Sequence, residues 1–132
     1  MKGLVWLRSD LRTDDNPALK SAFEQCGEVI AIFLYSPVQA ALHNESNIKS
    51  DFIIKNLKSL GSKLKSLNVS LIIKKSEGFD QDPLLINSFV NEHNIDKVFF
   101  NKQFGFDENE RDKNVISLLT ASNINFEKFN DQ

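Results

Sequence analysis

The sequence predicts an α/β fold in which helices cover both faces of a five-stranded parallel sheet. Short apolar runs alternate along the chain with longer stretches of helical character, and such alternation is typical of parallel sheets. Prolines that follow helix-capping residues mark where helices begin, and Gly or Asn residues mark where they end. Because crossover connections are right-handed, the alternation favours a Rossmann-like sheet with the strand order 3-2-1-4-5.

The predicted strands are short runs rich in Val, Ile, Leu and Phe. Runs that are nearly continuous, rather than alternating, are typical of strands buried on both faces, and we expect this of the first four. In chain order, the predicted strands are Gly3–Leu7, Val29–Tyr35, Val69–Ile73, Lys97–Asn101 and Asn125–Phe129.

The helices are predicted from their ends. A capping residue followed by proline marks a helix start, because proline has a fixed φ and lacks an N–H that the first turn cannot use. The pairs are Asn16-Pro17, Ser36-Pro37 and Asp82-Pro83. Gly and Asn tolerate the left-handed conformation that ends helices, and they precede new apolar runs at Gly27, Asn68, Asn94 and Asn123. The predicted helices are Pro17–Cys26, Lys49–Leu67, Pro83–His93 and Asp107–Ser122.

The longest predicted helix contains several lysines and one glycine. Its apolar residues repeat at spacings of three and four, so the lysines between them indicate a solvated face rather than a phosphate site. Gly61 in the helix interior costs about 1 kcal/mol relative to Ala, which predicts close packing at that position.

Length and composition indicate one soluble domain over residues 1–132. The net charge of −2 argues against nucleic-acid binding by bulk electrostatics. The single cysteine, Cys26, cannot form an internal disulfide, which indicates a reducing compartment. No apolar stretch approaches the roughly 20 residues that cross a bilayer. We therefore expect a cytoplasmic monomer that does not contact a membrane.

Nucleotide-binding motifs are missing from the predicted loops. A dinucleotide fold needs a glycine-rich turn after its first strand, and this chain reads "RSDLRTDDN" there and has no P-loop. A receiver domain would use paired carboxylates such as Asp14 and Asp15. It would also need an aspartate directly after the third strand, where this chain reads "LIIKKSEG". A free-standing Rossmann-like nucleotide-binding module is therefore disfavoured but kept as an alternative.

Groups for metal binding or nucleophilic catalysis are also scarce. His43 and His93 are the only histidines, and His93 lies in the last turn of its predicted helix, where a cation suits the dipole. Cys26 has no basic neighbour in the sequence that would activate its thiol. We predict neither a metal site nor a catalytic residue in this chain.

The stretch "VWLRSDLRTDDNPAL", residues 5–19, resembles the N-terminal signature of the DNA photolyase/cryptochrome family, W-[FL]-R-x-D-L-R-x-x-D-N-x-A-L. Two later segments, "SPVQAALHN" and "VFFNKQFGFDENERDKNV", resemble the family in the same order and spacing. The resemblance spans essentially the whole chain. It is strongest toward the class I cyclobutane pyrimidine dimer photolyases of bacteria.

The resemblance implies a light-harvesting, or antenna, domain of a deoxyribodipyrimidine photolyase, a blue-light-dependent lyase that repairs DNA. In the family this domain binds 5,10-methenyltetrahydrofolate or a deazaflavin, which passes excitation to FAD. The FAD lies in a C-terminal helical domain that receives the flipped-out pyrimidine dimer. We expect this chain to lack that domain, which would be its partner, and to be inactive alone. An antenna domain of a cryptochrome photoreceptor is the alternative.

The resemblance also implies ligand contacts. In folate-binding members an Asn-Glu pair and a His touch the ligand, and these roles carry over to Asn109, Glu110 and His43. A carboxylate such as that of Glu110 can accept hydrogen bonds from the adjacent amino group and ring N–H of a pterin. The alternative for Asn109 and Glu110 is helix-start chemistry. One departure from the family is Lys102, a charge in "FNKQF" where the family often has "YNYQY".

Charges of both signs crowd the exit of the first strand at Arg8, Asp10 and Arg12. One interpretation is a local ion-pair network at the loop surface, which would contribute little stability. The resemblance instead places these charges near the junction with the helical domain, where burial and multiple pairing would give geometric specificity. We favour the interdomain contact.

Overall fold

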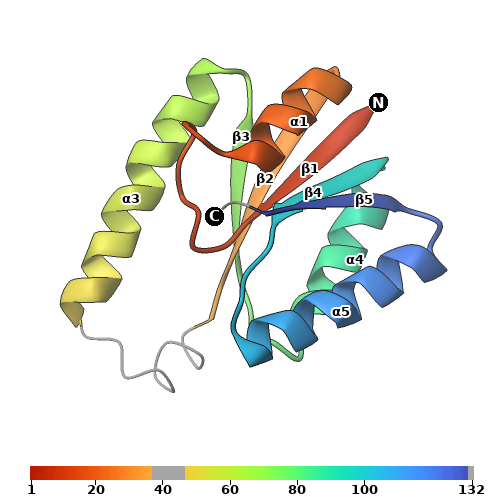
Figure 1. Ribbon diagram of the computed structural model, residues 1–132. Coiled ribbons are helices and arrows are strands. Elements are labelled where there is room, and N and C mark those ends of the chain that lie inside the picture. Colours follow the sequence, from red (N-terminus) through yellow and green to blue (C-terminus); the bar gives the residue numbers. More distant parts are fainter. Residues whose placement is uncertain (37–46, 131–132) are drawn as a thin grey trace.

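The computed structural model describes residues 1–36 and 47–130. Its strands form one five-stranded sheet in the order β3-β2-β1-β4-β5, and all neighbouring strands are parallel (Figure 1). The predicted fold class and strand order are therefore confirmed. The strands are β1 (Lys2–Leu7), β2 (Glu28–Tyr35), β3 (Ser70–Lys75), β4 (Lys97–Asn101) and β5 (Asn125–Phe129).

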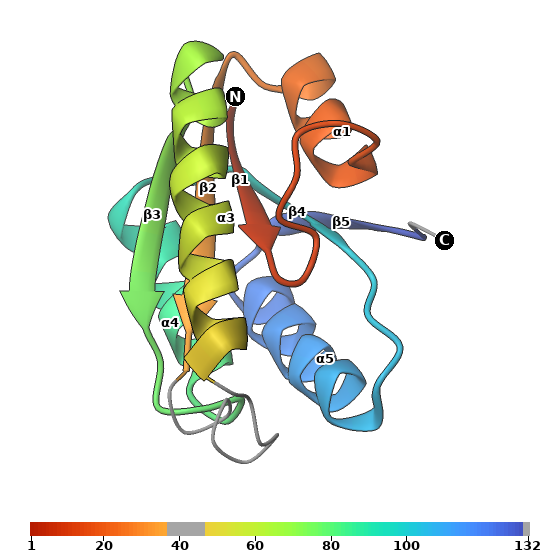
Figure 2. The same cartoon turned by 90° about the vertical axis from the view of Figure 1, so that its left-hand side faces the viewer.

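Helices cover both faces of the sheet. Side chains of α1 and α3 pack in one core, and side chains of α4 and α5 pack in the other. Figure 2 looks onto the face that α3 covers. Every predicted helix and strand bound agrees with the structure to within two residues. Within the described part of the chain, the helices are α1 (Pro17–Gln25), α3 (Asn47–Ser66), α4 (Asp82–Glu92) and α5 (Phe106–Ala121).

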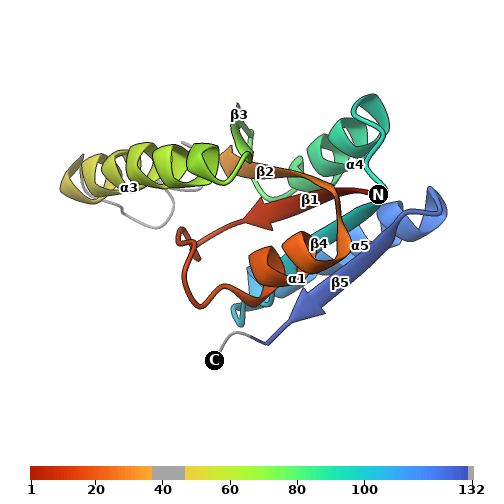
Figure 3. The same cartoon turned by 90° about the horizontal axis from the view of Figure 1, so that it is seen from above.

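β1 lies at the centre of the sheet and contributes to both cores. Successive strand residues point to opposite faces, so Val5 and Leu7 pack with α1 and α3, whereas Leu4 and Trp6 pack with α4 and α5. All four side chains are buried. The strands fan out on both sides of β1 when the sheet is seen from above (Figure 3). The loop that follows β1 therefore begins at the centre of the sheet, between the two helical layers.

β3 does not have the burial that its sequence predicted. Its apolar run favoured a strand buried on both faces, but β3 lies at the edge of the sheet and pairs with β2. Its side chains are half-buried or exposed, and Ile73 is 52% exposed. Lys74 and Lys75 end the strand. Lysines on an edge strand discourage pairing with another chain.

The predicted helix starts have mixed outcomes. Asn16 caps α1, because its Oδ1 accepts a hydrogen bond from the backbone N–H of Leu19 at 3.2 Å. Asp82 does not cap α4: it is itself the first helical residue, and its carboxylate is bonded to Ser76 instead. The third pair, Ser36-Pro37, runs into residues outside the described ranges.

The predicted helix ends agree better with the structure. Asn68, Asn94 and Asn123 have left-handed φ angles of 62°, 55° and 59°, as expected for Asn at these positions. Gly27 does not follow the pattern, because α1 ends through Cys26 in an extended conformation with φ of −120°. Among the described residues, no helix is both long and apolar enough to span a membrane.

Two glycines should respond in opposite ways to replacement by alanine. A Cβ on Gly3 would lie 2.7 Å from the Cys26 Sγ and 3.1 Å from the Phe99 ring, so Gly3→Ala should lower the free energy of unfolding by about 1–3 kcal/mol. A Cβ on Gly61 would meet its nearest neighbour, Leu71, at 3.7 Å, so the predicted close packing is wrong. Gly61→Ala should raise the free energy of unfolding by about 1 kcal/mol.

Urea unfolding followed by the fluorescence of Trp6 measures both changes. Gly27→Ala is the control, since a Cβ there would have no neighbour within 4 Å. A Gly3→Ala variant as stable as the wild type would contradict the close approach of β1 to Cys26.

Candidate functional site

A pocket of about 350 Å³ lies beyond the carboxyl ends of β1 and β4. One wall is the loop after β1, with Ser9, Asp10 and Arg12, and the other is the segment 101–105 after β4. Glu108, from the first turn of α5, completes the lining. In the observed strand order the chain leaves β1 and β4 toward opposite edges of the sheet. Parallel sheets bind their ligands at this kind of switch point.

Other hollows are weaker candidates. A groove of about 740 Å³ lies along α1, and one of about 500 Å³ lies between α3 and β3. The first is lined by a single continuous stretch, residues 13–24, and the second lies away from the carboxyl edge of the sheet. The β1–β4 pocket instead joins two segments about ninety residues apart, with converging carboxylate, amide and cationic groups. We therefore take it as the candidate site.

Asn101, the last residue of β4, ties the two walls together from beneath. Its amide group donates to the Asp10 Oδ2 at 2.6 Å and to the Asn16 Oδ1 at 2.8 Å. Its Oδ1 accepts a hydrogen bond from the backbone N–H of Ala18 at 3.1 Å. Asn101 is 3% exposed, and both hydrogens of its side-chain amide are used in hydrogen bonds. β4, the loop after β1 and the first turn of α1 are therefore joined at one buried amide.

The loop after β1 is also folded onto itself. The Asp10 Oδ1 accepts from the backbone N–H of Arg8 at 2.8 Å, and the Asn16 Nδ2 donates to the carbonyl of Arg12 at 3.0 Å. Asp10 and Asn16 thus each link this loop internally and to Asn101. Side chains that satisfy backbone groups in this way hold a loop in a single conformation.

Arg8 is buried beneath this edge of the sheet. Its Nη1 donates to the Asp112 Oδ1 at 2.8 Å, and its Nη2 donates to the carbonyl oxygen of Asn101. The guanidinium lies 4.4 Å from the centroid of the Trp6 ring and 5.0 Å from that of Phe100. Burial lowers the pKa of Arg8 from its ordinary value, while Asp112 opposes the shift. The charge is thus compensated by an ion pair and two aromatic faces.

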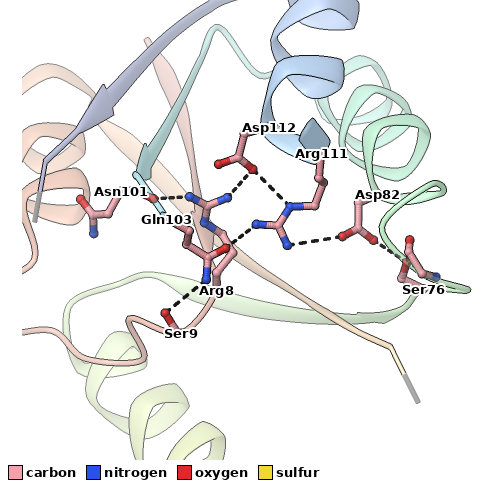
Figure 4. Close-up of polar contacts among 9 residues, drawn as sticks. Arg8, Ser9, Ser76, Asp82, Asn101, Gln103, Arg111 and Asp112 are labelled. Atoms are coloured by element: carbon pink, nitrogen blue, oxygen red, sulfur yellow. Dashed lines mark hydrogen bonds and ion pairs between the residues drawn. The ribbon is translucent and has the colours of Figure 1, made fainter. Parts of the chain in front are cut away.

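A second buried arginine, Arg111, shares the same carboxylate (Figure 4). Its Nε donates to the Asp112 Oδ1 at 3.2 Å, and its Nη2 donates to the Oε1 of Gln103 in the pocket wall. The guanidinium lies 4.9 Å from the Trp6 ring centroid and 4.5 Å from that of Phe79. Trp6 therefore contacts both guanidinium groups, and Asp112 bridges them.

Asp82, at the start of α4, is the last member of this group of buried charges and contacts Arg111. One of its oxygens lies 3.9 Å from the Arg111 Nη1, and the other accepts a hydrogen bond from the Ser76 hydroxyl. Burial raises the pKa of Asp82, and the Ser76 hydrogen bond and Arg111 act in the opposite direction. The sequence assigned Asp82 to helix capping, but the tertiary partners Arg111 and Ser76 take its carboxylate instead.

The residues assigned to ligand contact lie in different places. Asn109 and Glu110 are exposed on the first turns of α5 and do not line the pocket. The Glu110 carboxylate lies 3.3 Å from the ammonium of Lys113 on the same helix. Glu108, two positions earlier than Glu110, lines the pocket. His43 lies outside the described residues.

The carboxylate of Glu108 folds back over Gly105, where a Cβ would collide with it. Gly105 is the N-cap residue of α5 and offers no side chain to cap the helix. A glutamate at the third position of a helix commonly reaches back toward the N-cap. The helix start therefore places this carboxylate at the edge of the pocket.

The three charged residues assigned to an interdomain contact differ in their exposure to solvent. Arg8 and Asp10 are 7% exposed and have partners inside this domain, so their burial has the local cause that the sequence interpretation set aside. Arg12 is exposed, lines the pocket and donates from its Nη2 to the carbonyl of Asp15 at 2.9 Å. Contact of these residues with another domain stays a prediction. Within the described residues, no group of His, Cys, Asp and Glu has the arrangement of a metal site.

Asp82→Asn should flatten the pH dependence of stability. Burial raises the folded-state pKa of Asp82 above its ordinary value of 3.8, so the folded protein keeps a proton that the unfolded chain releases. The contribution of Asp82 to the free energy of unfolding therefore falls as the pH rises from 3.8 through the raised pKa. Urea unfolding over a series of pH values measures how the free energy of unfolding changes with pH. Asp80→Asn, at an exposed residue two positions before Asp82, is the control. Equal slopes for the wild type and Asp82→Asn would contradict the prediction.

Comparison with known proteins finds a family model, photo-lyases and cryptochromes that match this chain. The family model described as DNA photolyase matches residues 3–132. A deoxyribodipyrimidine photo-lyase of Vibrio cholerae is 31% identical over 129 residues, covering 98% of this chain and 28% of that protein. Cryptochrome-1 of Arabidopsis thaliana is 33% identical over 127 residues, covering 96% of this chain and 18% of that protein. The chain thus spans about a quarter or less of the length of these relatives.

Solved structures share the fold. A cryptochrome of Synechocystis superposes with a TM-score of 0.88 at 21% identity, covering 98% of this chain and 27% of that one. An archaeal photolyase of Sulfolobus tokodaii superposes with a TM-score of 0.83 at 23% identity, covering 98% of this chain and 29% of that one. Since the family model matches almost the whole sequence, the chain belongs to the DNA photolyase family.

Proposed function

We propose that this chain is the antenna domain of a light-driven flavoprotein and that it holds a heteroaromatic light-harvesting cofactor in the β1–β4 pocket. The observation that carries the proposal is the pocket itself. It lies at the switch point of the sheet and brings together a carboxylate, Glu108, an amide, Gln103, and an aromatic ring, Phe104. Its volume of about 350 Å³ lies within the usual range of roughly 300–1,000 Å³ for small-molecule sites.

The lining suits the ring of a folate or a deazaflavin. Both ring systems present an N–H beside other polar groups along one edge, and a carboxylate accepts hydrogen bonds from such an edge. Glu108 supplies that carboxylate, and the half-exposed ring of Phe104 offers an aromatic face on the same wall. When bound, 5,10-methenyltetrahydrofolate or a deazaflavin supplies light absorption and transfer of excitation to FAD. The domain binds and orients it.

Two assignments of the binding carboxylate compete. The resemblance assigned Asn109 and Glu110, with His43 as a third contact. Asn109 and Glu110 are exposed and can serve a ligand that extends across the outer side of α5. The lining of the pocket favours Glu108. We propose that Glu108 makes the principal contact with the ring, and we keep Asn109, Glu110 and His43 as the rival set.

The whole protein is proposed to be a deoxyribodipyrimidine photo-lyase with FAD in a C-terminal helical domain, acting on pyrimidine dimers in DNA. The support is the family and the Vibrio cholerae relative. This domain would meet the helical domain through the exposed rim of the pocket, with Arg12 and Lys102. Arg8 and Asp10 would act from within, by fixing the loop that carries Arg12.

A cryptochrome photoreceptor is the second candidate, because Cryptochrome-1 of Arabidopsis thaliana is as similar to this chain as the photo-lyases are. Both candidates give this domain the same role. They differ in what the flavin domain does after excitation.

Glu108→Ala should weaken binding of 5,10-methenyltetrahydrofolate more than Glu110→Ala does. Loss of hydrogen bonds to a charged carboxylate corresponds to about 1.5–3 kcal/mol, or roughly 10- to 100-fold in the dissociation constant. Glu110 is the matched control, since it lies two residues away and is paired with Lys113 on the exposed side of the helix. Fluorescence titration with the folate, repeated with a deazaflavin, measures both variants.

The reverse ranking of these variants would return the assignment to Asn109 and Glu110. A wild-type chain that binds neither ligand would contradict the proposal that the β1–β4 pocket is sufficient for antenna binding.

The 132-residue chain alone should not split pyrimidine dimers under blue light, because the proposed reaction takes place at FAD in another domain. The same residues joined to an FAD-containing C-terminal domain should restore monomeric thymines in ultraviolet-irradiated oligothymidine, measured by recovery of ultraviolet absorbance. A joined protein that holds reduced FAD but leaves the dimers intact would favour the cryptochrome candidate.

A further inference from the structure

We propose that Gln103 is a positioning residue that holds the two walls of the pocket together, with Arg111 fixing its orientation. The inference deepens the proposed function and rests on it for the ligand, since Gln103 lines the same pocket. The link between the walls is a property of the chain alone. It can therefore be measured without any ligand.

Gln103 bridges two segments that are far apart in the sequence. Its Nε2 donates to the Ser9 Oγ at 3.3 Å across the pocket. Ser9 belongs to the loop after β1, and Gln103 belongs to the segment between β4 and α5. Both residues line the pocket, so this bond links its two walls. This bond is exposed to solvent, whereas the amide of Asn101 joins the same two walls in the buried interior.

Arg111 determines which end of the Gln103 amide faces the pocket. Its Nη2 donates to the Gln103 Oε1, so the amide oxygen faces the guanidinium and the amide nitrogen faces Ser9 (Figure 4). The opposite orientation would place two hydrogen-bond donors against each other. The amide of Gln103 is therefore held in one orientation.

Arg111 is itself held rigidly. It is 6% exposed, it is bonded to Asp112, and its guanidinium lies against the rings of Trp6 and Phe79. Asp82, fixed by its bond to Ser76, lies on the other side of the guanidinium. Any movement of the guanidinium would break these contacts and leave a buried charge less well compensated.

The consequence is a preorganised pocket. Without the bridge, the exposed side of each wall would move independently, and a ligand would have to order both segments on binding. Backbone hydrogen bonds in the two walls report this motion separately. The N–H of Arg12 donates to the carbonyl of Asp10, and the N–H of Lys102 donates to the carbonyl of Phe129.

The test combines three variants with amide hydrogen exchange. Gln103→Leu removes both bonds of the bridge at similar volume, Ser9→Ala removes the outer bond, and Gln103→Glu retains an acceptor for both Arg111 and the Ser9 hydroxyl. Gln103→Leu should speed exchange at Arg12 and Lys102 by roughly three- to tenfold, the effect of losing one ordinary hydrogen bond. Ser9→Ala should speed exchange at Arg12 alone, and Gln103→Glu should leave both amides near the wild-type rate.

Ligand binding supplies the second measurement. Gln103→Leu should weaken binding of 5,10-methenyltetrahydrofolate by roughly three- to tenfold, measured under conditions in which the variant stays folded. Combining Ser9→Ala with Gln103→Leu should add nothing to the effect of Gln103→Leu on Arg12 exchange, because both changes break the same link.

Unchanged exchange at both amides in Gln103→Leu would overturn the inference. Faster exchange at both amides in Ser9→Ala would overturn it as well, because the Lys102 wall should be held by Arg111. If the exchange pattern is as expected but the wild-type chain binds no folate, the bridge is supported and the proposed function fails. The two failures are thereby distinguishable.

Discussion

Two positive charges buried under one edge of the sheet govern how α5 is placed. Arg8 directly follows β1, Arg111 comes from α5, and both are bonded to Asp112. Because each buried charge needs a partner, Arg111 and Asp112 must face the sheet although they are among the most polar residues of the helix. They continue the inward stripe of Val115 and Leu119 at helical spacing. Three residues before Arg111, the same stripe brings Glu108 to the pocket, while Asn109 and Glu110 turn to the solvent.

The buried amide of Asn101 provides the second constraint. It follows three apolar residues of β4, Val98, Phe99 and Phe100, and it bonds to the loop after β1 and to the start of α1. The charges and amides that follow β1 in the sequence thus largely form the internal framework of the edge that carries the β1–β4 pocket. Arg8, Asp10 and Asn16 build this edge, and Arg12 is displayed on it.

The fold could be predicted closely, because apolar runs and helix-end residues are local signals. Asn68 and Asn123 end their helices in the predicted conformation. The site could be predicted only in part. "FDENERDKNV" is polar at nearly every position, so no hydrophobic pattern shows which side of α5 faces inward, and Glu108 could not be distinguished from Glu110. Asp82 likewise matched a capping pattern, but its partner Arg111 is distant in the sequence and is revealed only by the tertiary structure.

We have proposed the β1–β4 pocket as the ligand site of this domain. A titration of the chain with 5,10-methenyltetrahydrofolate, followed by backbone amide NMR, tests it most directly. We expect the shifts to concentrate at residues 9–12, 102–105 and 108, on the two walls joined by Asn101. Shifts confined to the groove along α1, or to the groove between α3 and β3, would contradict it.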